Sequence, residues 1–288
     1  FKPVTAVAAL KAGLDPNRRI YDGRYIEMGG HKFGCSNYNN GLGSHGYQTL
    51  AQGIQNSCNY FFAEVAHRLA TNRDTLVYST DMGVDTIRRY ASMFGLNRPS
   101  GIEIPETTPE LTTEDPERSA MGQGTNSYSN VQLSRYVAAI ANSGTVYDLS
   151  LLDKMTDSEG NLIKDFTPEV TGHVDIADST WDAVHQGMRA VVTDGSVNKI
   201  FKDLEVEIAG KTGTAQESRT RGNHAFFISY GPYTNPEICV TVNIPYGYSS
   251  SNAAMVAKNV YRFYYGYTDL ESILGSGALE VSNVKVGD

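Results

Sequence analysis

The chain has 288 residues, of which 40% are apolar and 19% are charged, so it is long enough to bury one large core or two modest ones. Its formal net charge of −8 argues against nucleic acid or an anionic membrane surface as the main partner, because both attract clustered lysine and arginine. No apolar run approaches the roughly 18 residues that span a bilayer and no signal peptide stands at Phe1, so we expect any targeting segment to lie upstream.

The first two thirds of the chain are predicted to be mainly helical. Apolar residues at helical spacing indicate helices over residues 3–12, about 49–70, 85–96, 131–144 and 179–192. The stretch 21–46 is rich in Gly and Asn, and its apolar residues follow neither the helical nor the strand periodicity, so we predict a long irregular loop there. Loops of this length inside a domain are usually functional or tied down. Residues 146–170 are predicted to form a small polar excursion.

The last third is predicted to contain strands and a closing helix. The segments "VEIAGKTGTAQ" (206–216), "NHAFFISYGP" (223–232) and "EICVTVNIPYG" (237–247) have strand composition, and the last two read as an antiparallel hairpin. A final helix is predicted over 252–266. This order of elements predicts an α+β fold in which helices pack on an antiparallel sheet.

The strongest single motif is the Lys-Thr-Gly sequence at 211–213, within a predicted strand. Taken alone it could be a solvated turn between two strands. A strand edge with Lys211, a hydroxyl from Thr212 or Thr214 and no side chain at Gly213 could instead pair with an extended peptide and hold its carboxylate. We therefore predict a substrate-binding strand.

A second motif, Ser57-Cys58-Asn59, lies within the predicted helix 49–70. Taken alone, Ser57 and Asn59 would be read as ordinary capping residues. Class A β-lactamases and penicillin-binding proteins, however, carry S-x-x-K, S-D-N and K-T-G in this order. Here Lys2, the 57–59 triplet and the 211–213 triplet follow that order, although Cys58 replaces the Asp and the Ser of S-x-x-K would precede Phe1.

The chain resembles the class B penicillin-binding proteins, which are peptidoglycan D,D-transpeptidases, and most closely the elongation or sporulation type. The resemblance rests on the motifs above and on the stretches "FKPVTAVAALKAG", "SHGYQTLAQGIQNSCNYFFAEVA" and "MGQGTNSYSNVQLSRYVAAIANSGTVY". The resemblance implies an antiparallel sheet flanked by helices plus an all-helical subdomain. It implies a single transpeptidase domain over 1–288, with a helical part of about 14–200 inserted between the first helix and the C-terminal sheet at 204–265. From the resemblance we also expect the N-terminal membrane anchor and pedestal of such proteins to be absent from this chain.

The resemblance also implies a mechanism that needs no cofactor for its chemistry. The serine before Phe1 would be the nucleophile, Lys2 its base and Ser57 the proton relay. Lys2 must be neutral for that role, and both burial and a nearby cation such as Lys211 lower a lysine pKa. Asn59 would hold the substrate amide and Lys2, while the residues at 211–214 (Lys211, Thr212, Gly213 and Thr214) would take the terminal carboxylate and supply an oxyanion-hole N–H.

The same resemblance implies partners and a location. The partners would be peptidoglycan stem peptides, β-lactam antibiotics and a membrane glycan polymerase, and no nucleic acid. The protein would act at the extracytoplasmic face of the bacterial cell membrane, with roles in cell-wall synthesis, cell shape and β-lactam resistance.

A metal site is a further hypothesis for the loop. Cys35, His45 and Cys58 suit tetrahedral zinc, and a loop poor in apolar residues needs some other tether. Asp22 is the preferred fourth ligand and His31 the alternative, and related transpeptidases hold a metal in the corresponding loop. The spacing matches no known zinc finger, so a Cys35–Cys58 disulfide or two unconnected cysteines with a structural His45 remain open.

Other functions share these motifs. A serine β-lactamase or a D,D-carboxypeptidase would have the same fold, although no segment clearly supplies the Glu that activates a deacylating water. A penicillin sensor or a scaffold domain without catalysis is the non-enzymatic alternative. The lifetime of the acyl-enzyme with a labelled penicillin distinguishes these alternatives.

Overall fold

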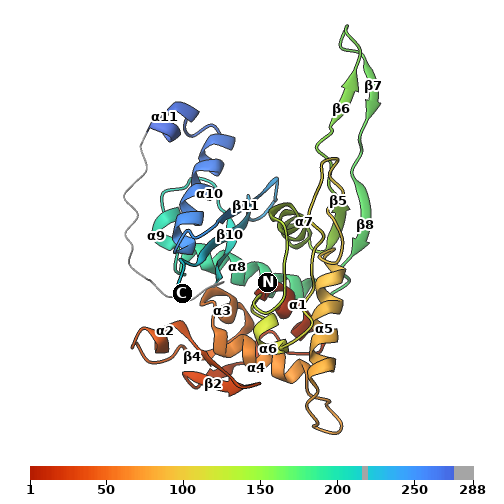
Figure 1. Cartoon of the computed structure of the whole chain (residues 1–288). Coiled ribbons are helices and arrows are strands. Elements are labelled where there is room, and N and C mark those ends of the chain that lie inside the picture. The colour runs from red at the N-terminus through yellow and green to blue at the C-terminus, as the bar shows by residue number, and fades with distance from the viewer. Residues whose placement is uncertain (216–219, 276–288) are drawn as a thin grey trace.

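The structure of the protein, a computed structural model, describes residues 1–215 and 220–275 (Figure 1). Its helices are α1 (Lys2–Lys11), α2 (Ser36–Asn39), α3 (Leu50–Gln55), α4 (Asn59–Leu69), α5 (Thr80–Met93), α6 (Pro116–Ser119), α7 (Asn130–Ala141), α8 (Asp178–Thr193), α9 (Asn198–Phe201), α10 (Ser250–Tyr264) and α11 (Leu270–Gly275). Its strands are β1 (Ile20–Asp22), β2 (Tyr25–Met28), β3 (His31–Gly34), β4 (Gly46–Gln48), β5 (Thr145–Asp148), β6 (Lys154–Thr156), β7 (Leu162–Asp165), β8 (Glu169–His173), β9 (Ala209–Ala215), β10 (His224–Gly231) and β11 (Ile238–Ile244).

The largest sheet is antiparallel, with the strand order β11–β10–β9. Tyr261 of α10 donates a hydrogen bond to Ser229 Oγ at 3.0 Å, whereas the ring of Tyr230 lies against His185 of α8, with centroids 5.9 Å apart. Because neighbouring residues of a strand point to opposite faces, α10 and α8 cover opposite faces of the sheet. Burial of both faces explains why β10 has a nearly continuous apolar run.

Helix α1 lies at the centre of the molecule, and every residue from Pro3 to Leu10 is buried (Figure 1). Its apolar character all around fits a helix that neighbours enclose, here α3, α4, α5 and α8. Pro3 is tolerated because the first turn needs no backbone N–H from it. This packing fixes Lys2 at the amino end of a rigid, buried element.

The prediction of an irregular loop over 21–46 was wrong. This stretch contains α2 and a hairpin of β2 and β3 in which Glu27 pairs with Lys32. Gly29 and Gly30 join the two strands with φ of 56° and 77°. A two-residue hairpin turn with positive φ at both positions is the arrangement for which Gly-Gly is favoured, so the signal was present in the sequence.

The prediction of one helix over 49–70 was also wrong, because α3 ends before Ser57 and α4 begins after Cys58. Ser57 has a φ of 49°, a left-handed conformation that is costly for any residue with a side chain. The turn is closed by backbone hydrogen bonds from Ser57 to Ile54 and from Cys58 to Gly53, both 3.1 Å. The break redirects the chain at the second motif.

The predicted polar excursion at 146–170 is a ribbon of strands. β5 pairs with β8 and β6 with β7, both antiparallel, and the ribbon projects from the body of the molecule (Figure 1). The residues of β6 and β7 are exposed.

The α+β fold class is confirmed, with a helix-flanked antiparallel sheet and a largely helical part that also holds the short ladders described above. Within residues 1–215 and 220–275, no helix has the length and apolar character needed to cross a membrane.

Candidate active site

Lys2 projects from the start of α1 toward the turn between α3 and α4. Its Nζ donates hydrogen bonds to the carbonyl oxygen of Ser57, to Ser57 Oγ and to Asn59 Oδ1, each at 2.9 Å. The left-handed backbone at Ser57 lets its carbonyl and its hydroxyl face the same ammonium group. The structure thus brings together the first two predicted motifs.

Lys211 reaches the same hydroxyl from β9. Its Nζ lies 2.8 Å from Ser57 Oγ, 3.0 Å from the carbonyl oxygen of Thr212 and 3.2 Å from Thr212 Oγ1. Lys211 is only 3% exposed, and these three hydrogen bonds help to compensate the burial of its charge. All three motifs therefore meet at one oxygen atom, Ser57 Oγ.

This arrangement can move a proton between the two lysines. A hydroxyl that accepts hydrogen bonds from two ammonium groups still has its own proton to donate. When either lysine is neutral, Ser57 can donate to it and receive a proton from the other. Ser57 is thus placed to act as a proton relay between α1 and β9.

Phe1, which directly precedes α1, lies in the same site, because it lines one cleft together with Lys2, Ser57 and Lys211.

An open cleft of about 700 Å³ lies over these groups. Lys2, Ser57 and Asn59 line it together with residues 211–214 of β9 and with part of the β2–β3 hairpin. Among the described strands β9 pairs only with β10, so its other edge has no strand partner. An extended peptide could add to that edge as a further strand.

The absence of a side chain at Gly213 was predicted to let the strand pair with an extended peptide. A Cβ atom at this position would lie 3.3 Å from the Cβ of Phe226, its cross-strand neighbour. The tight contact is therefore with the protein's own sheet, and Thr212 and Thr214 flank Gly213 along the cleft.

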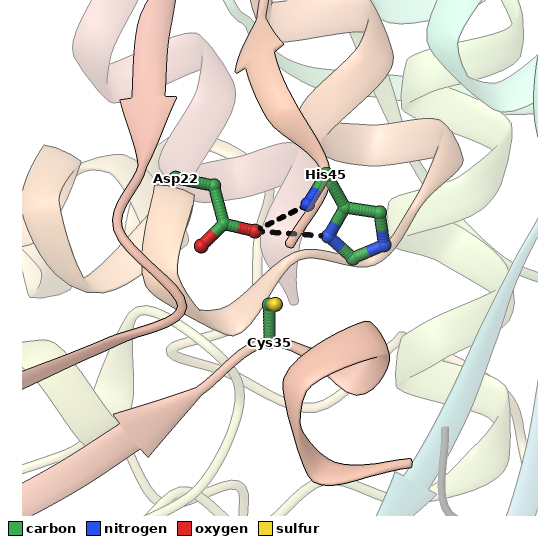
Figure 2. A group of neighbouring side chains, drawn as sticks. All are labelled: Asp22, Cys35 and His45. Atoms are coloured by element: carbon green, nitrogen blue, oxygen red, sulfur yellow. Dashed lines mark hydrogen bonds and ion pairs between the residues drawn. The ribbon is translucent and has the colours of Figure 1, made fainter. Parts of the chain in front are cut away.

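A second polar cluster comprises Asp22, Cys35 and His45 (Figure 2). One ligand atom from each lies within 4.8 Å of the others, and Asp22 Oδ2 accepts hydrogen bonds from the backbone N–H of His45 at 3.0 Å and lies 3.1 Å from its Nδ1. The Cys58 thiol donates to the same oxygen at 3.7 Å. The structure thus brings Asp22, Cys35 and His45 together, whereas Cys58 lies outside the group of atoms within 4.8 Å of one another and the alternative ligand His31 lies 3.5 Å from Asp115.

The cluster is buried and its thiols are free. Burial raises the pKa of Cys58 to about 12, and burial together with the hydrogen bond to Asp22 raises the pKa of Cys35. Burial alone would raise the pKa of Asp22, but hydrogen bonds from Cys35 and from the backbone of His45 and Arg24 outweigh it and lower that pKa. Without a metal ion the site is a carboxylate surrounded by neutral thiols.

Two cationic residues in the cleft were missed by the sequence reasoning. Lys32 of β3 and Arg118 of α6 both line it. The Gly-Gly hairpin turn, had it been recognised, would have placed Lys32 on a strand beside the site. Nothing in the sequence around Arg118 distinguishes it from other surface arginines.

Comparisons with known proteins identify the family of the chain. Residues 1–262 match the family model described as the penicillin binding protein transpeptidase domain. The peptidoglycan D,D-transpeptidase MrdA of Haemophilus influenzae is 27% identical, with 91% of this chain and 43% of that protein covered. The chain thus spans less than half of that relative.

Solved structures show the same fold. Penicillin-binding protein 2B from Streptococcus pneumoniae superposes with a TM-score of 0.80 at 24% identity, covering 93% of this chain and 47% of that one. A chain from a structure titled "Structural coordination of polymerization and crosslinking by a peptidoglycan synthase complex" superposes with a TM-score of 0.76 at 25% identity, covering 97% and 46%. The chain therefore belongs to the penicillin-binding protein transpeptidase domain family, as its motifs predicted.

Proposed function

We propose that this chain is the catalytic domain of a peptidoglycan D,D-transpeptidase that cross-links stem peptides through a serine acyl-enzyme. One observation carries the proposal. Ser57 Oγ lies 2.9 Å from Lys2 Nζ and 2.8 Å from Lys211 Nζ, beside a strand edge that could receive a peptide. That arrangement suits proton transfer to and from a serine nucleophile.

The nucleophile would be a serine three residues before Lys2 in the longer protein. Phe1 lines the cleft together with Lys2 and Lys211, which supports entry of the preceding residues into it. Lys2 takes the proton as the serine oxygen bonds to the carbonyl carbon between the two terminal D-alanines. Ser57 passes a proton to the nitrogen of the departing D-alanine, and the amine of a second stem peptide then displaces the serine as the new cross-link forms.

The other predicted site residues would bind substrate. Asn59 holds Lys2 and the substrate amide, and Thr212 and Thr214 take the terminal carboxylate, whose charge Lys211 complements. Gly213 lets the backbone of β9 pair with the peptide, and the N–H of Thr214 together with that of the nucleophile forms the oxyanion hole. Lys211 is buried and its Nζ donates to the carbonyl oxygen of Thr212 at 3.0 Å, which supports its role as a fixed positive charge.

The test is to map the acylated residue in the full-length protein. A labelled penicillin should add to one serine, and the adduct should lie on a tryptic peptide that ends at Lys11, because trypsin cleaves poorly between Lys2 and Pro3. An adduct on any other peptide, or no adduct at all, contradicts the proposal.

The lifetime of that adduct separates the proposal from its alternatives. A transpeptidase should keep the penicilloyl group for many minutes, whereas rapid release would indicate a serine β-lactamase. Release of D-alanine from a stem peptide without cross-linking in the presence of an acceptor amine would indicate a D,D-carboxypeptidase. Stable acylation without turnover of any peptide would indicate a penicillin sensor.

The partner would be a membrane glycan polymerase, at the extracytoplasmic face of the cell membrane. The likeness to a chain of a peptidoglycan synthase complex supports this assignment. Co-purification of the full-length protein with a glycan polymerase from detergent extracts tests it.

A structural zinc ion would fit the second cluster. Ligands of tetrahedral zinc lie roughly 3.3–3.8 Å apart, given bonds of about 2.0–2.3 Å. The 4.8 Å limit on the atoms of Asp22, Cys35 and His45 is close to that range, and Cys58, 3.7 Å from Asp22, offers a fourth ligand. Such an ion would tether the 21–46 region and take no part in the reaction.

Metal analysis of the purified full-length protein tests the zinc site. One zinc per chain is expected, with its loss in Cys35→Ser and its retention in Cys239→Ser, the matched thiol in β11. A metal-free wild type, or zinc retained in Cys35→Ser, would exclude the site.

A further inference from the structure

The described residues that line the cleft carry a net charge opposite to that of the whole protein. The formal net charge of the chain is −8, yet Lys2, Lys32, Arg118 and Lys211 line the cleft. Within the part of the chain that the structure describes, no aspartate or glutamate lines it. A cavity lined by one sign of charge concentrates ligands of the other sign.

The inner pair of cations already has a function in the proposed mechanism. Lys2 and Lys211 share Ser57 Oγ, and Lys211 would complement the single carboxylate at the end of the stem peptide. Lys32 and Arg118 are left without an anionic ligand in that scheme.

Lys32 is positioned by aromatic rings and not by a carboxylate. Its Nζ lies 3.8 Å from the centroid of the Tyr25 ring and donates to the Tyr38 hydroxyl at 3.2 Å. Among the described residues it forms no ion pair within 4.0 Å, and an ammonium group has three N–H donors. The hydrogen bond to Tyr38 raises the pKa of Lys32, so the group stays charged.

Arg118 lies beside the hairpin that carries Lys32. Asp115 contacts both Arg118 Nη1 and His31 Nε2, each at 3.5 Å, and His31 precedes Lys32 in β3. A guanidinium has five N–H donors, and this long ion pair occupies only one side of it. Lys32 and Arg118 together are called the outer cationic rim below.

We propose that the outer cationic rim binds a second free carboxylate of the donor stem peptide, upstream of its terminal D-alanines. This inference rests on the function proposed above and specifies its substrate. Two groups of a stem peptide could supply the carboxylate: the α-carboxylate of a γ-linked glutamate at position two, or the side-chain carboxylate of a diamino diacid at position three. The enzyme would then prefer donors in which that group is neither amidated nor absent.

The experiment uses the full-length protein and synthetic pentapeptide donors. One donor carries both upstream carboxylates, a second has the glutamate amidated, and a third has lysine at position three. Acylation kinetics are measured for the wild type, Lys32→Met, Arg118→Gln and the double variant, with Lys154→Met on the exposed β6 strand as the matched loss of charge. Thermal unfolding shows whether each variant is folded.

For the donor with both carboxylates, each rim substitution should raise KM about tenfold, the usual effect of losing one hydrogen bond to a charged group, with a smaller change in kcat. Lys154→Met should match the wild type. One of the two altered donors should be a poorer substrate of the wild type and should no longer respond to the rim substitutions, and that donor identifies the carboxylate.

The proposal is overturned if the rim variants affect all three donors equally or affect none. That result is distinct from failure of the proposed function, in which the wild type would be acylated neither by a labelled penicillin nor by any donor.

Discussion

The turn at residues 57–59 has two sides with different chemistry. Ser57 and Asn59 face the cleft and contact Lys2, whereas Cys58 between them is fully buried and donates to Asp22 on the other side. On the cleft side, Ser57 Oγ accepts hydrogen bonds from the ammonium groups of Lys2 and Lys211. The opposite side holds a carboxylate among thiols and an imidazole.

The difference indicates that three consecutive residues have separate roles, one in proton exchange and one in structural support. Groups on the cleft side are placed to exchange protons, and the open cleft gives a substrate access to them. Groups on the opposite side are enclosed and suit a fixed, supporting role. Peptide bonds join Cys58 to Ser57 and Asn59. A contact that fixes the Cys58 thiol, such as its hydrogen bond to Asp22, therefore also limits the movement of Ser57.

The largest effect is expected at Lys2. Lys2→Met in the full-length protein should slow acylation by a labelled penicillin by about 10²–10⁴-fold, the usual contribution of a positioned general base. Lys11→Met, at the exposed end of the same helix, should acylate at the wild-type rate. If Lys2→Met were acylated at the wild-type rate, the cleft side of the turn could not be the reactive side.

A smaller effect on acylation is expected at Ser57, where the loss of the hydroxyl can be separated from the effect of the backbone conformation. Ser57→Ala and Ser57→Gly should both slow acylation by about 10²-fold, because both lack the relay hydroxyl. The glycine variant should be more stable than the alanine variant by about 1 kcal/mol, since the φ of 49° favours glycine. Urea unfolding measures that difference, and equal stabilities would show that the backbone at Ser57 is unstrained.

The smallest effect on the chemistry is expected at Cys58. Cys58→Ala should lower the free energy of unfolding by about 1–2 kcal/mol and slow acylation less than tenfold, because the thiol does not touch the cleft. Cys239→Ala is the matched control and should leave acylation unchanged. A folded Cys58→Ala protein that acylates as slowly as Lys2→Met would place Cys58 in the reaction itself.

The sequence predicted which residues meet but not the backbone that brings them together. Lys2, Ser57 and Lys211 were predicted because their motifs occur in a known order, and Cys35 and His45 because thiols and imidazoles suit a metal. The break at Ser57 could not be predicted, since a left-handed conformation at a serine leaves no pattern in the apolar spacing. Lys32 was missed because the hairpin carrying it was taken for an irregular loop.

The unpaired edge of β9 has a consequence for the protein in solution. An open strand edge can pair with the same edge of another copy and begin aggregation, and natural proteins often place lysines there to prevent this. Lys32 and Arg118 line the cleft that contains this strand, and the same cations on a second copy would repel them. We therefore expect the cations of the cleft to disfavour pairing of two copies at the open strand.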